Sequence, residues 1–259
     1  MNRTVLYRAR HALVTAVALL SVSAYAADKP AETPAPAAAA AGLTDCPSFE
    51  ELRKKEAAKI DARQLKPLAT EPTQPELRKE LLAMMERDQK VRTNASASAK
   101  ANGGRPDQPL ILEIFQSDQD NVMRMRELVD ARQFPDATQV GRDGLRAAWL
   151  IAAHADRDPD LQAKLLALLE PQAAKGDIVP QDFALLSDRV KVAHGEPQLY
   201  GSQFRAVNRV SHPQPIEKPE GLEARRAEAG LLTMREYGCL LQQFHGIPVD
   251  LTPNEHVIH

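Results

Sequence analysis

Ionisable side chains end three apolar stripes of helical spacing in this sequence. The first stripe ends in Asp88 and Arg92, the second in His154 and the third in Asp188. A charged group that is buried without a partner costs several kcal/mol, so these side chains must meet partners or reach a site. A histidine with carboxylates and a guanidinium can transfer protons and stabilise negative charge.

One interpretation of these residues is an enzyme that uses His154 as its general acid or base. Asp156 or Asp188 would orient the imidazole, and Arg92 or Tyr200 would stabilise developing negative charge, which is a hydrolase-like set without an evident nucleophile. A metal site made of the histidine and these two aspartates has weak support, because His-x-Asp alone is not a zinc motif. We therefore expect no metal and no cofactor.

The same residues also have a structural interpretation. Asp88 and Arg92 have the i,i+4 spacing of an ion pair on a helix surface, worth some tenths of a kcal/mol, and the sequence favours this interpretation for them. A lone histidine such as His154, at the end of an apolar stripe, is more often a hydrogen-bonded core residue than a catalytic one. A polar network that only fixes the fold is thus an alternative to a site.

Residues 198–204, QLYGSQF, contain one of the two tyrosines that lie outside the first 26 residues. In an extended segment Gln198, Tyr200 and Ser202 point to the same side, and Gly201 allows another element to approach closely. Because this segment follows the third stripe, we expect it to cover the ends of all three stripes. The tyrosine hydroxyl and the glutamine amide would then converge with the ionisable groups.

The first 26 residues have the pattern of a bacterial secretory signal peptide. Arg3, Arg8 and Arg10 precede an apolar run, and the small-x-small sequence AYA ends at Ala26. The run is shorter than the roughly 20 residues that span a membrane, so we expect cleavage after Ala26 and no stable membrane insertion. The mature protein is then periplasmic or secreted.

Composition narrows the class of the mature chain. Loss of the three arginines takes the formal charge from −2 to −5, because residues 1–26 contain no acidic residue. No basic cluster indicates binding to nucleic acid. The remaining chain of about 230 residues is long enough for one domain with a sizeable core. Cys46 and Cys239 would meet an oxidising compartment, and the sequence leaves open a disulfide between them or two free thiols.

Helix signals recur along the chain, whereas strand-like alternation is almost absent. We predict an all-α fold of six to eight helices in one domain, with an irregular or hairpin-like segment at 196–218. Residues 27–46 are rich in proline and alanine and predict a disordered linker. The domain then spans 47–245, followed by a C-terminal tail at 246–259. The predicted helices are 48–64, 75–94, one that starts near 118 after a loop, 143–154, 159–176, 180–194 and one or two within 219–244.

The polar motifs, in their order, resemble those of a bacterial family of domains of unknown function. The resemblance covers about 76–237, and it implies an α-helical domain without a known activity. The motifs are DQxxR at 88–92, DxxN at 118–121, HAD at 154–156, DRV at 188–190 and QLYGSQ at 198–203. They add candidates for binding a small polar ligand: Asp88, Gln89, Arg92, Asp118, Asn121, Gln162, Arg189, Gln198, Tyr200 and Gln203.

The leading hypothesis is an exported helical domain that binds a small polar ligand. The alternatives are a hydrolase-like enzyme that uses His154, and a structural or protein-interaction domain with a sealed polar network. Relatives usually have a glutamine where this chain has Ala153, so one hydrogen-bonding partner is missing here. A water-reachable pocket would favour binding or catalysis, and a sealed cluster would favour the structural alternative.

Overall fold

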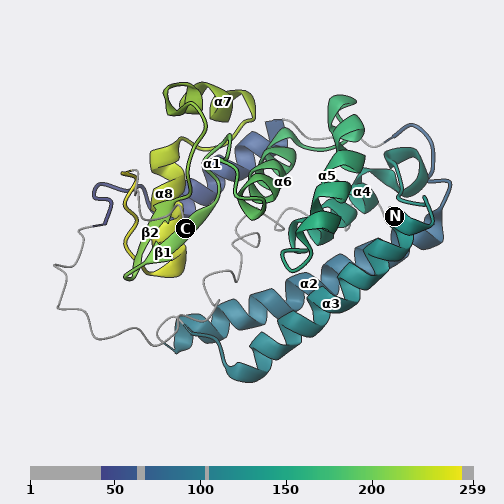
Figure 1. Ribbon diagram of the computed structural model, residues 1–259, viewed down its shortest axis with the longest axis horizontal. Helices are drawn as coiled ribbons and strands as arrows, with labels where there is room; N and C mark the ends of the chain where they lie inside the picture. The colour runs from purple at the N-terminus through teal and green to yellow at the C-terminus, as the bar shows by residue number, and fades with distance from the viewer. Residues whose placement is uncertain (1–41, 63–67, 103–104, 253–259) are drawn as a thin grey trace, which may run out of the picture.

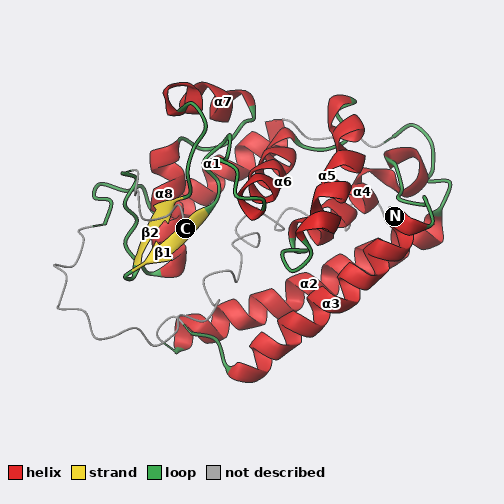
Figure 2. Cartoon of the chain, in the orientation of Figure 1, coloured by secondary structure: helices red, strands yellow, loops and turns green. Residues whose placement is uncertain are grey.

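The chain folds into helices packed around one central helix, with a small β-hairpin near its C-terminal end (Figures 1 and 2). The computed structural model describes residues 42–62, 68–102 and 105–252. The predominance of helix in these residues confirms the predicted class. The elements are α1 (Phe49–Ala62), α2 (Pro75–Ala101), α3 (Gln108–Asp130), α4 (Ala137–Ala153), α5 (Pro159–Ala174), α6 (Pro180–Ala193), β1 (Phe204–Val207), β2 (Val210–Pro213), the 3₁₀ turn η3 (Pro219–Gly221), α7 (Leu222–Glu228) and α8 (Met234–His245).

The helices α2 and α3 lie side by side as a long hairpin (Figure 1). The predicted loop between them was largely wrong, because α2 continues to Ala101 and α3 already begins at Gln108. Contacts within the turn close the hairpin: Ser98 Oγ donates to a carboxylate oxygen of Asp107 at 2.7 Å, and Asn102 Nδ2 donates to the other at 2.9 Å. Ser98 is a weaker helix former than the alanines around it, and these contacts help to keep the last turn of α2 helical.

The central helix α4 begins earlier than the sequence predicted. Asp136 accepts hydrogen bonds from the backbone N–H groups of Thr138 and Gln139, and the Gln139 side chain accepts one from the backbone of Asp136. This capping box follows the Asp-x-x-Gln pattern, which sequence reasoning missed. A kink follows at Gly141, where φ is +72°, a conformation that glycine adopts without steric cost.

The main apolar core surrounds α4, which is buried along most of its length. It packs against α2, α3, α5 and α6. Trp149 Nε1 donates to the Asp182 carbonyl at 2.8 Å, which ties α4 to α6 and satisfies a buried donor. Because α4 is enclosed on several sides, the residues at its C-terminal end are positioned by several helices at once. The largest side chains of this core include Leu81, Met125, Leu145, Leu165 and Leu186.

A smaller core joins α1 to α8 beside the β-hairpin. The two strands pair antiparallel, from Phe204 opposite Pro213 to Val207 opposite Val210. The hairpin lies within the segment predicted to be irregular or hairpin-like.

The segment before α1 is attached to α8. A disulfide joins Cys46 to Cys239 with a Cα–Cα distance of 5.5 Å. The side chain of Gln242 also accepts from the Leu43 N–H and donates to its carbonyl, each at 2.9 Å. Residues 42–46 therefore belong to the folded unit and not to a disordered linker, whereas residues 27–41 and the predicted signal peptide lie outside the described residues.

The start of the predicted C-terminal tail is also part of the fold. Val249 is buried and pairs with Ser211 of β2, because the Ser211 N–H donates to the Pro248 carbonyl at 2.8 Å and the Asp250 N–H donates to the Ser211 carbonyl at 3.0 Å. Residues 253–259 lie outside the described part. Among the helices of the described residues, none has the length and apolar character needed to cross a membrane.

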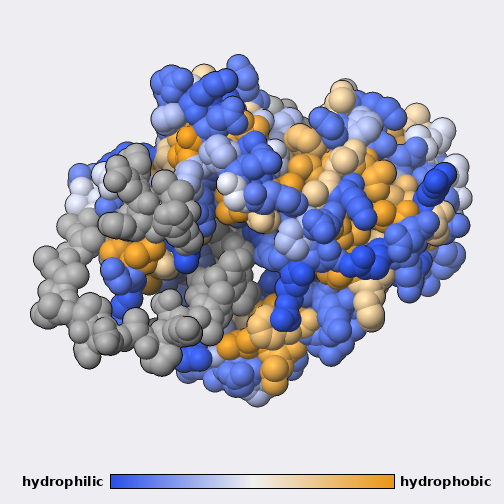
Figure 3. All heavy atoms as spheres, in the orientation of Figure 1, coloured by the Kyte–Doolittle hydropathy of each residue, from blue (hydrophilic) through white to orange (hydrophobic). Residues whose placement is uncertain are grey.

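The face shown in Figure 3 is mostly hydrophilic, with patches of apolar atoms over α5 and at the lower end of α3. Leu112, Phe115 and Met123 are exposed large apolar side chains of this helix. The guanidinium of Arg157 lies 4.7 Å from the centre of the Phe115 ring, which covers part of this surface by a cation–π contact.

Candidate functional site

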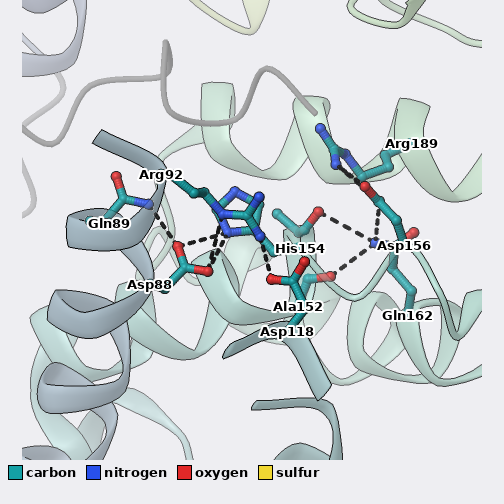
Figure 4. Close-up of polar contacts among 10 residues, drawn as sticks. Asp88, Gln89, Arg92, Asp118, Ala152, His154, Asp156, Gln162 and Arg189 are labelled. Carbon is teal, nitrogen blue, oxygen red and sulfur yellow. Dashed lines mark hydrogen bonds and ion pairs between the residues drawn. The ribbon is translucent and has the colours of Figure 1, made fainter. Parts of the chain in front are cut away.

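His154 lies at the C-terminal end of α4 and contacts Asp88 of α2 (Figure 4). Its Nδ1 is 3.1 Å from one carboxylate oxygen of Asp88 and 2.9 Å from the other. The two residues are 5% and 1% exposed, respectively. Asp88 therefore orients the imidazole, and the prediction that Asp156 or Asp188 does so was wrong.

Arg92 connects Asp88 to Asp118 of α3. Its Nε donates to Asp88 Oδ1 at 3.2 Å, and one of its terminal nitrogens pairs with Asp118. Gln89 adds a hydrogen bond to the second carboxylate oxygen of Asp88, at 2.9 Å. The interpretation of Asp88 and Arg92 as a surface ion pair was thus wrong, since Asp88 is buried and the Arg92 side chain is only 11% exposed.

The charges of this group depend on how its members are buried. Burial lowers the pKa of His154, and the nearby positive charge of Arg92 lowers it further. The imidazole is therefore neutral, and it donates its Nδ1–H to Asp88. Burial alone would raise the pKa of Asp88, but its contacts with His154 and Arg92 hold it at about 2. Burial raises the pKa of Asp118 to about 6, because Arg92 is shared with Asp88 and compensates only in part.

Asn121 lies one helical turn after Asp118 on α3, so it extends the same face toward the core. It is 6% exposed, and its Nδ2 has no hydrogen-bond partner in the described part of the chain. A buried amide donor without a partner costs about 1–3 kcal/mol. Gln162, another member of the predicted set, likewise has a buried atom, Oε1, without a partner among the described residues.

A second polar group follows directly on the C-terminal side of His154 (Figure 4). Arg189 of α6 donates from one terminal nitrogen to both carboxylate oxygens of Asp156, each at 2.9 Å. Gln162 of α5 donates to the Ala152 carbonyl at 3.0 Å and to Asp156 at 3.3 Å. The Asp156 side chain is 34% exposed, so here the polar cluster reaches the surface.

Asp188 lies apart from these groups and binds the backbone of residues 199–202. Its carboxylate accepts from the N–H of Leu199 at 2.7 Å, of Tyr200 at 2.9 Å and of Ser202 at 2.9 Å. Burial raises the pKa of Asp188, and these donors counteract part of that increase. Asp188 therefore shapes the chain after α6 and does not join His154.

Gln198 and Gln203 fix the base of the β-hairpin. The Gln198 amide donates to the carbonyls of Gln203 and Gln214, both at 2.9 Å, and accepts from the Gln203 N–H at 2.8 Å. The Gln203 side chain donates to Ser202 Oγ at 3.0 Å. Both glutamines have structural contacts that account for their position.

Tyr200 does not take the predicted place in the polar cluster. Its N–H is bound to Asp188, whereas its hydroxyl makes no hydrogen bond to any described residue and its side chain is half-buried. Burial raises the pKa of this tyrosine. The predicted convergence therefore holds for Arg92 and His154 but not for Asp188, Gln198 and Tyr200.

Sequence reasoning missed Arg226, which holds the same segment from the other side. It is buried and donates to the backbone carbonyls of Tyr200, Gly201 and Leu232. Its guanidinium also lies 5.1 Å from the centre of the Tyr237 ring. The four-residue spacing from buried Leu222 was the signal that placed this arginine on an inward face.

The described residues contain no group of three or more histidine, cysteine, aspartate or glutamate side chains arranged to hold a metal ion. Both cysteines form the disulfide, so neither is a thiolate nucleophile. The arrangement offers instead a neutral imidazole held by one carboxylate, a guanidinium shared by two carboxylates, and an unsatisfied amide donor.

These features define a class: a mostly α-helical domain with a buried polar cluster at the end of its central helix. The chain belongs to the family of unknown function designated DUF6624, whose model matches residues 75–250. The match includes α2 to α8 and hence the whole cluster, while α1 and the segment bearing Cys46 precede it. No curated protein and no solved structure matches the chain significantly.

Proposed function

We propose that this domain binds a small polar ligand at the end of α4, beside His154, Asp118 and Asn121. The observation that carries the proposal is the Nδ2 group of Asn121, a buried donor without a partner among the described residues. Asn121 follows Asp118 on an inward helix face, next to the ion pair between Arg92 and Asp118. A ligand atom that accepts a hydrogen bond would satisfy it.

The balance of charge indicates the kind of ligand. Three carboxylates, those of Asp88, Asp118 and Asp156, outnumber the guanidiniums of Arg92 and Arg189, while the imidazole is neutral. Well-packed apolar residues are often as stabilising as buried ion pairs, so stability alone does not require this cluster. We expect a ligand that has a positive group for a carboxylate and an acceptor for Asn121, such as a small hydroxylated amine.

Catalysis is a second candidate, favoured by one specific contact. Asp88 holds Nδ1–H of His154, which is how a carboxylate orients an imidazole that acts as a base through its other nitrogen. The sealed structural network is the third, and the burial of Asp88 and His154 supports it. The experiment below separates ligand binding from a sealed structural network.

We also propose that the protein is exported. The signal-like residues 1–26 support export, and a disulfide between Cys46 and Cys239 is typical of proteins from oxidising compartments. The ligand would then come from the cell envelope or its surroundings.

Ligand binding is tested by calorimetric titration and thermal shift with ethanolamine, diethanolamine and glucosamine, each of which has an ammonium and a hydroxyl. We expect at least one of these amines to bind the wild-type protein, and Asn121→Leu to weaken that binding at least tenfold, or about 1.4 kcal/mol. The variant should keep or raise the melting temperature, because leucine has a similar volume and removes an unsatisfied donor. Gln119→Leu, an exposed change on the same helix, is the matched control and should bind normally.

Two outcomes would contradict the binding proposal. If none of the amines binds and His154→Ala lowers the free energy of unfolding by about 1–3 kcal/mol, the cluster is a sealed structural network. If Asn121→Leu binds as the wild type does, the ligand does not use this donor and the proposed site is wrong.

A further inference from the structure

A second candidate site lies at the end of the α2–α3 hairpin that is opposite its turn. A cavity of about 440 Å³ opens where the start of α2, the end of α3 and the start of α4 meet. The first two of these helix ends lie together at the right of Figure 1. The volume of the cavity is within the range of small-molecule sites, about 300–1,000 Å³. Leu77 and Leu128 provide apolar surface, and the other lining residues are polar or charged.

The charged residues of this cavity are only partly paired. Arg124 and Glu80 bind each other through two contacts, Nε to Oε1 at 2.6 Å and Nη2 to Oε2 at 3.0 Å. Glu76 and Arg132 line the same cavity, but their side chains make no hydrogen bond or ion pair with any described residue. The cavity thus presents one unpaired carboxylate and one unpaired guanidinium that do not neutralise each other.

The backbone of Arg132 is unusual for this residue type. Its φ is +55°, in the left-handed region that terminates α3. The Arg132 N–H donates to the Val129 carbonyl at 3.0 Å, and the Gln133 N–H donates to the Leu128 carbonyl at 2.8 Å. Such helix ends usually have glycine at the left-handed position, since a side chain there is strained. Arg132 therefore carries its side chain at the cavity from a strained backbone position.

We propose that this cavity binds a small zwitterion, a molecule that has both a free ammonium and a free carboxylate, such as an amino acid or a short peptide. Arg132 binds the carboxylate, and Glu76 binds the ammonium. Leu77 and Leu128 contact an apolar side chain between the two charged ends. A guanidinium recognises a carboxylate through paired, charge-assisted hydrogen bonds. This site is independent of the ligand proposed at His154.

The test uses calorimetric titration of the full chain with leucine and the dipeptide Leu-Leu. N-acetyl-Leu-Leu and Leu-Leu amide each lack one of the two charges. We expect leucine or Leu-Leu to bind, and each blocked peptide to bind at least tenfold more weakly than Leu-Leu. Arg132→Gly and Glu76→Gln should each weaken the binding at least tenfold.

Arg132→Gly also separates binding from stability. The change removes the guanidinium but relieves the left-handed strain, so the melting temperature should rise while binding is lost. The matched control is Arg209→Gly, because Arg209 is also an exposed arginine with positive φ, +65°, and lies in the β-hairpin turn. This control should raise the melting temperature without any change in binding.

Three results would overturn the proposal. The first is no binding of leucine or Leu-Leu at about 10 mM. The second is equal binding of Leu-Leu and both blocked peptides, which would show that the charges are not recognised. The third is unchanged binding by Arg132→Gly.

Discussion

At the scale of single residues, the burial of a polar side chain was easier to predict than the group that it contacts. His154 and Asp188 are buried, as their spacing predicted, whereas the surface ion pair favoured for Asp88 and Arg92 was wrong, because both contact the buried polar cluster. The carboxylate that holds the imidazole comes from α2 and not from the residues next to His154 in sequence. Asp118 has an unfavourable position for a carboxylate, because it is largely buried and shares Arg92 with Asp88.

Asp118 predicts a specific dependence of stability on pH. Its pKa is raised by burial to about 6 in the folded state, above that of the unfolded chain, so the folded state binds more protons between about pH 4 and 6. Its contribution to stability is therefore present at pH 4 and is lost as the pH rises through 6. The free energy of unfolding of Asp118→Asn minus that of the wild type should therefore be about 2–3 kcal/mol larger at pH 7 than at pH 4.

This prediction is checked by urea unfolding of both proteins at several pH values. Asp120→Asn, on the exposed side of α3, is the matched control for loss of one negative charge. A stability difference between Asp118→Asn and wild type that stays constant from pH 4 to 7 would contradict the raised pKa. The contribution of Asp88 to stability depends on pH in the opposite direction. Its pKa is held at about 2, so this contribution is lost as the pH falls from about 4 to 2.

At the scale of elements, Asp188 explains the segment QLYGSQF. The carboxylate at the end of α6 accepts N–H groups from Leu199, Tyr200 and Ser202, and Arg226 donates to carbonyls of the same segment. The segment is therefore held between an internal anion and an internal cation. Gly201 has φ +67° in this turn, and an added Cβ would lie 3.0 Å from the sulfur of Met234.

Asp188→Ala should therefore destabilise the C-terminal part of the fold. It leaves three buried or partly buried N–H groups without their acceptor, and we expect the free energy of unfolding to fall by about 3 kcal/mol or more. Asp188→Asn keeps one oxygen acceptor, so its free energy of unfolding should fall less than that of Asp188→Ala. Chemical denaturation measures the change, with Ser187→Ala on the same helix as control. An unchanged midpoint for Asp188→Ala would mean that solvent replaces these hydrogen bonds.

At the scale of the whole molecule, the disulfide joins the beginning of the described chain to its last helix. Cys46 and Cys239 are 193 residues apart, so the closed loop contains nearly the whole domain. Cross-linking a loop of this length restricts the unfolded chain and stabilises the fold by up to roughly 5 kcal/mol in the chain-entropy model. Such a bond is consistent with the proposed export.

Export and the disulfide can be measured together on protein isolated from its native cells. We expect the intact mass to correspond to a chain that begins at Ala27, because cleavage is predicted after Ala26. Reduction should add the mass of two hydrogens and lower the denaturation midpoint, since the loop is then open. A chain that retains its N-terminal residues, with both cysteines reactive toward iodoacetamide, would refute export and the disulfide in the native protein.

The sequence by itself determined the helical class, most helix starts and the inward positions of His154 and Asp188. Each of these follows from interactions between residues a few positions apart: caps, proline at the first turn, and apolar spacing of three and four. The early start of α4 carried such a signal as well, in Asp136 and Gln139, although it was missed.

Only the tertiary structure decided which groups meet. Asp88 and His154 are 66 residues apart, and their contact depends on how α2 packs against α4. The same holds for the backbone bound by Asp188 and for the α2–α3 turn, whose helical residues are stabilised by contacts across the hairpin. Local spacing determines the face on which a side chain lies, but the packing of distant elements determines which group it faces.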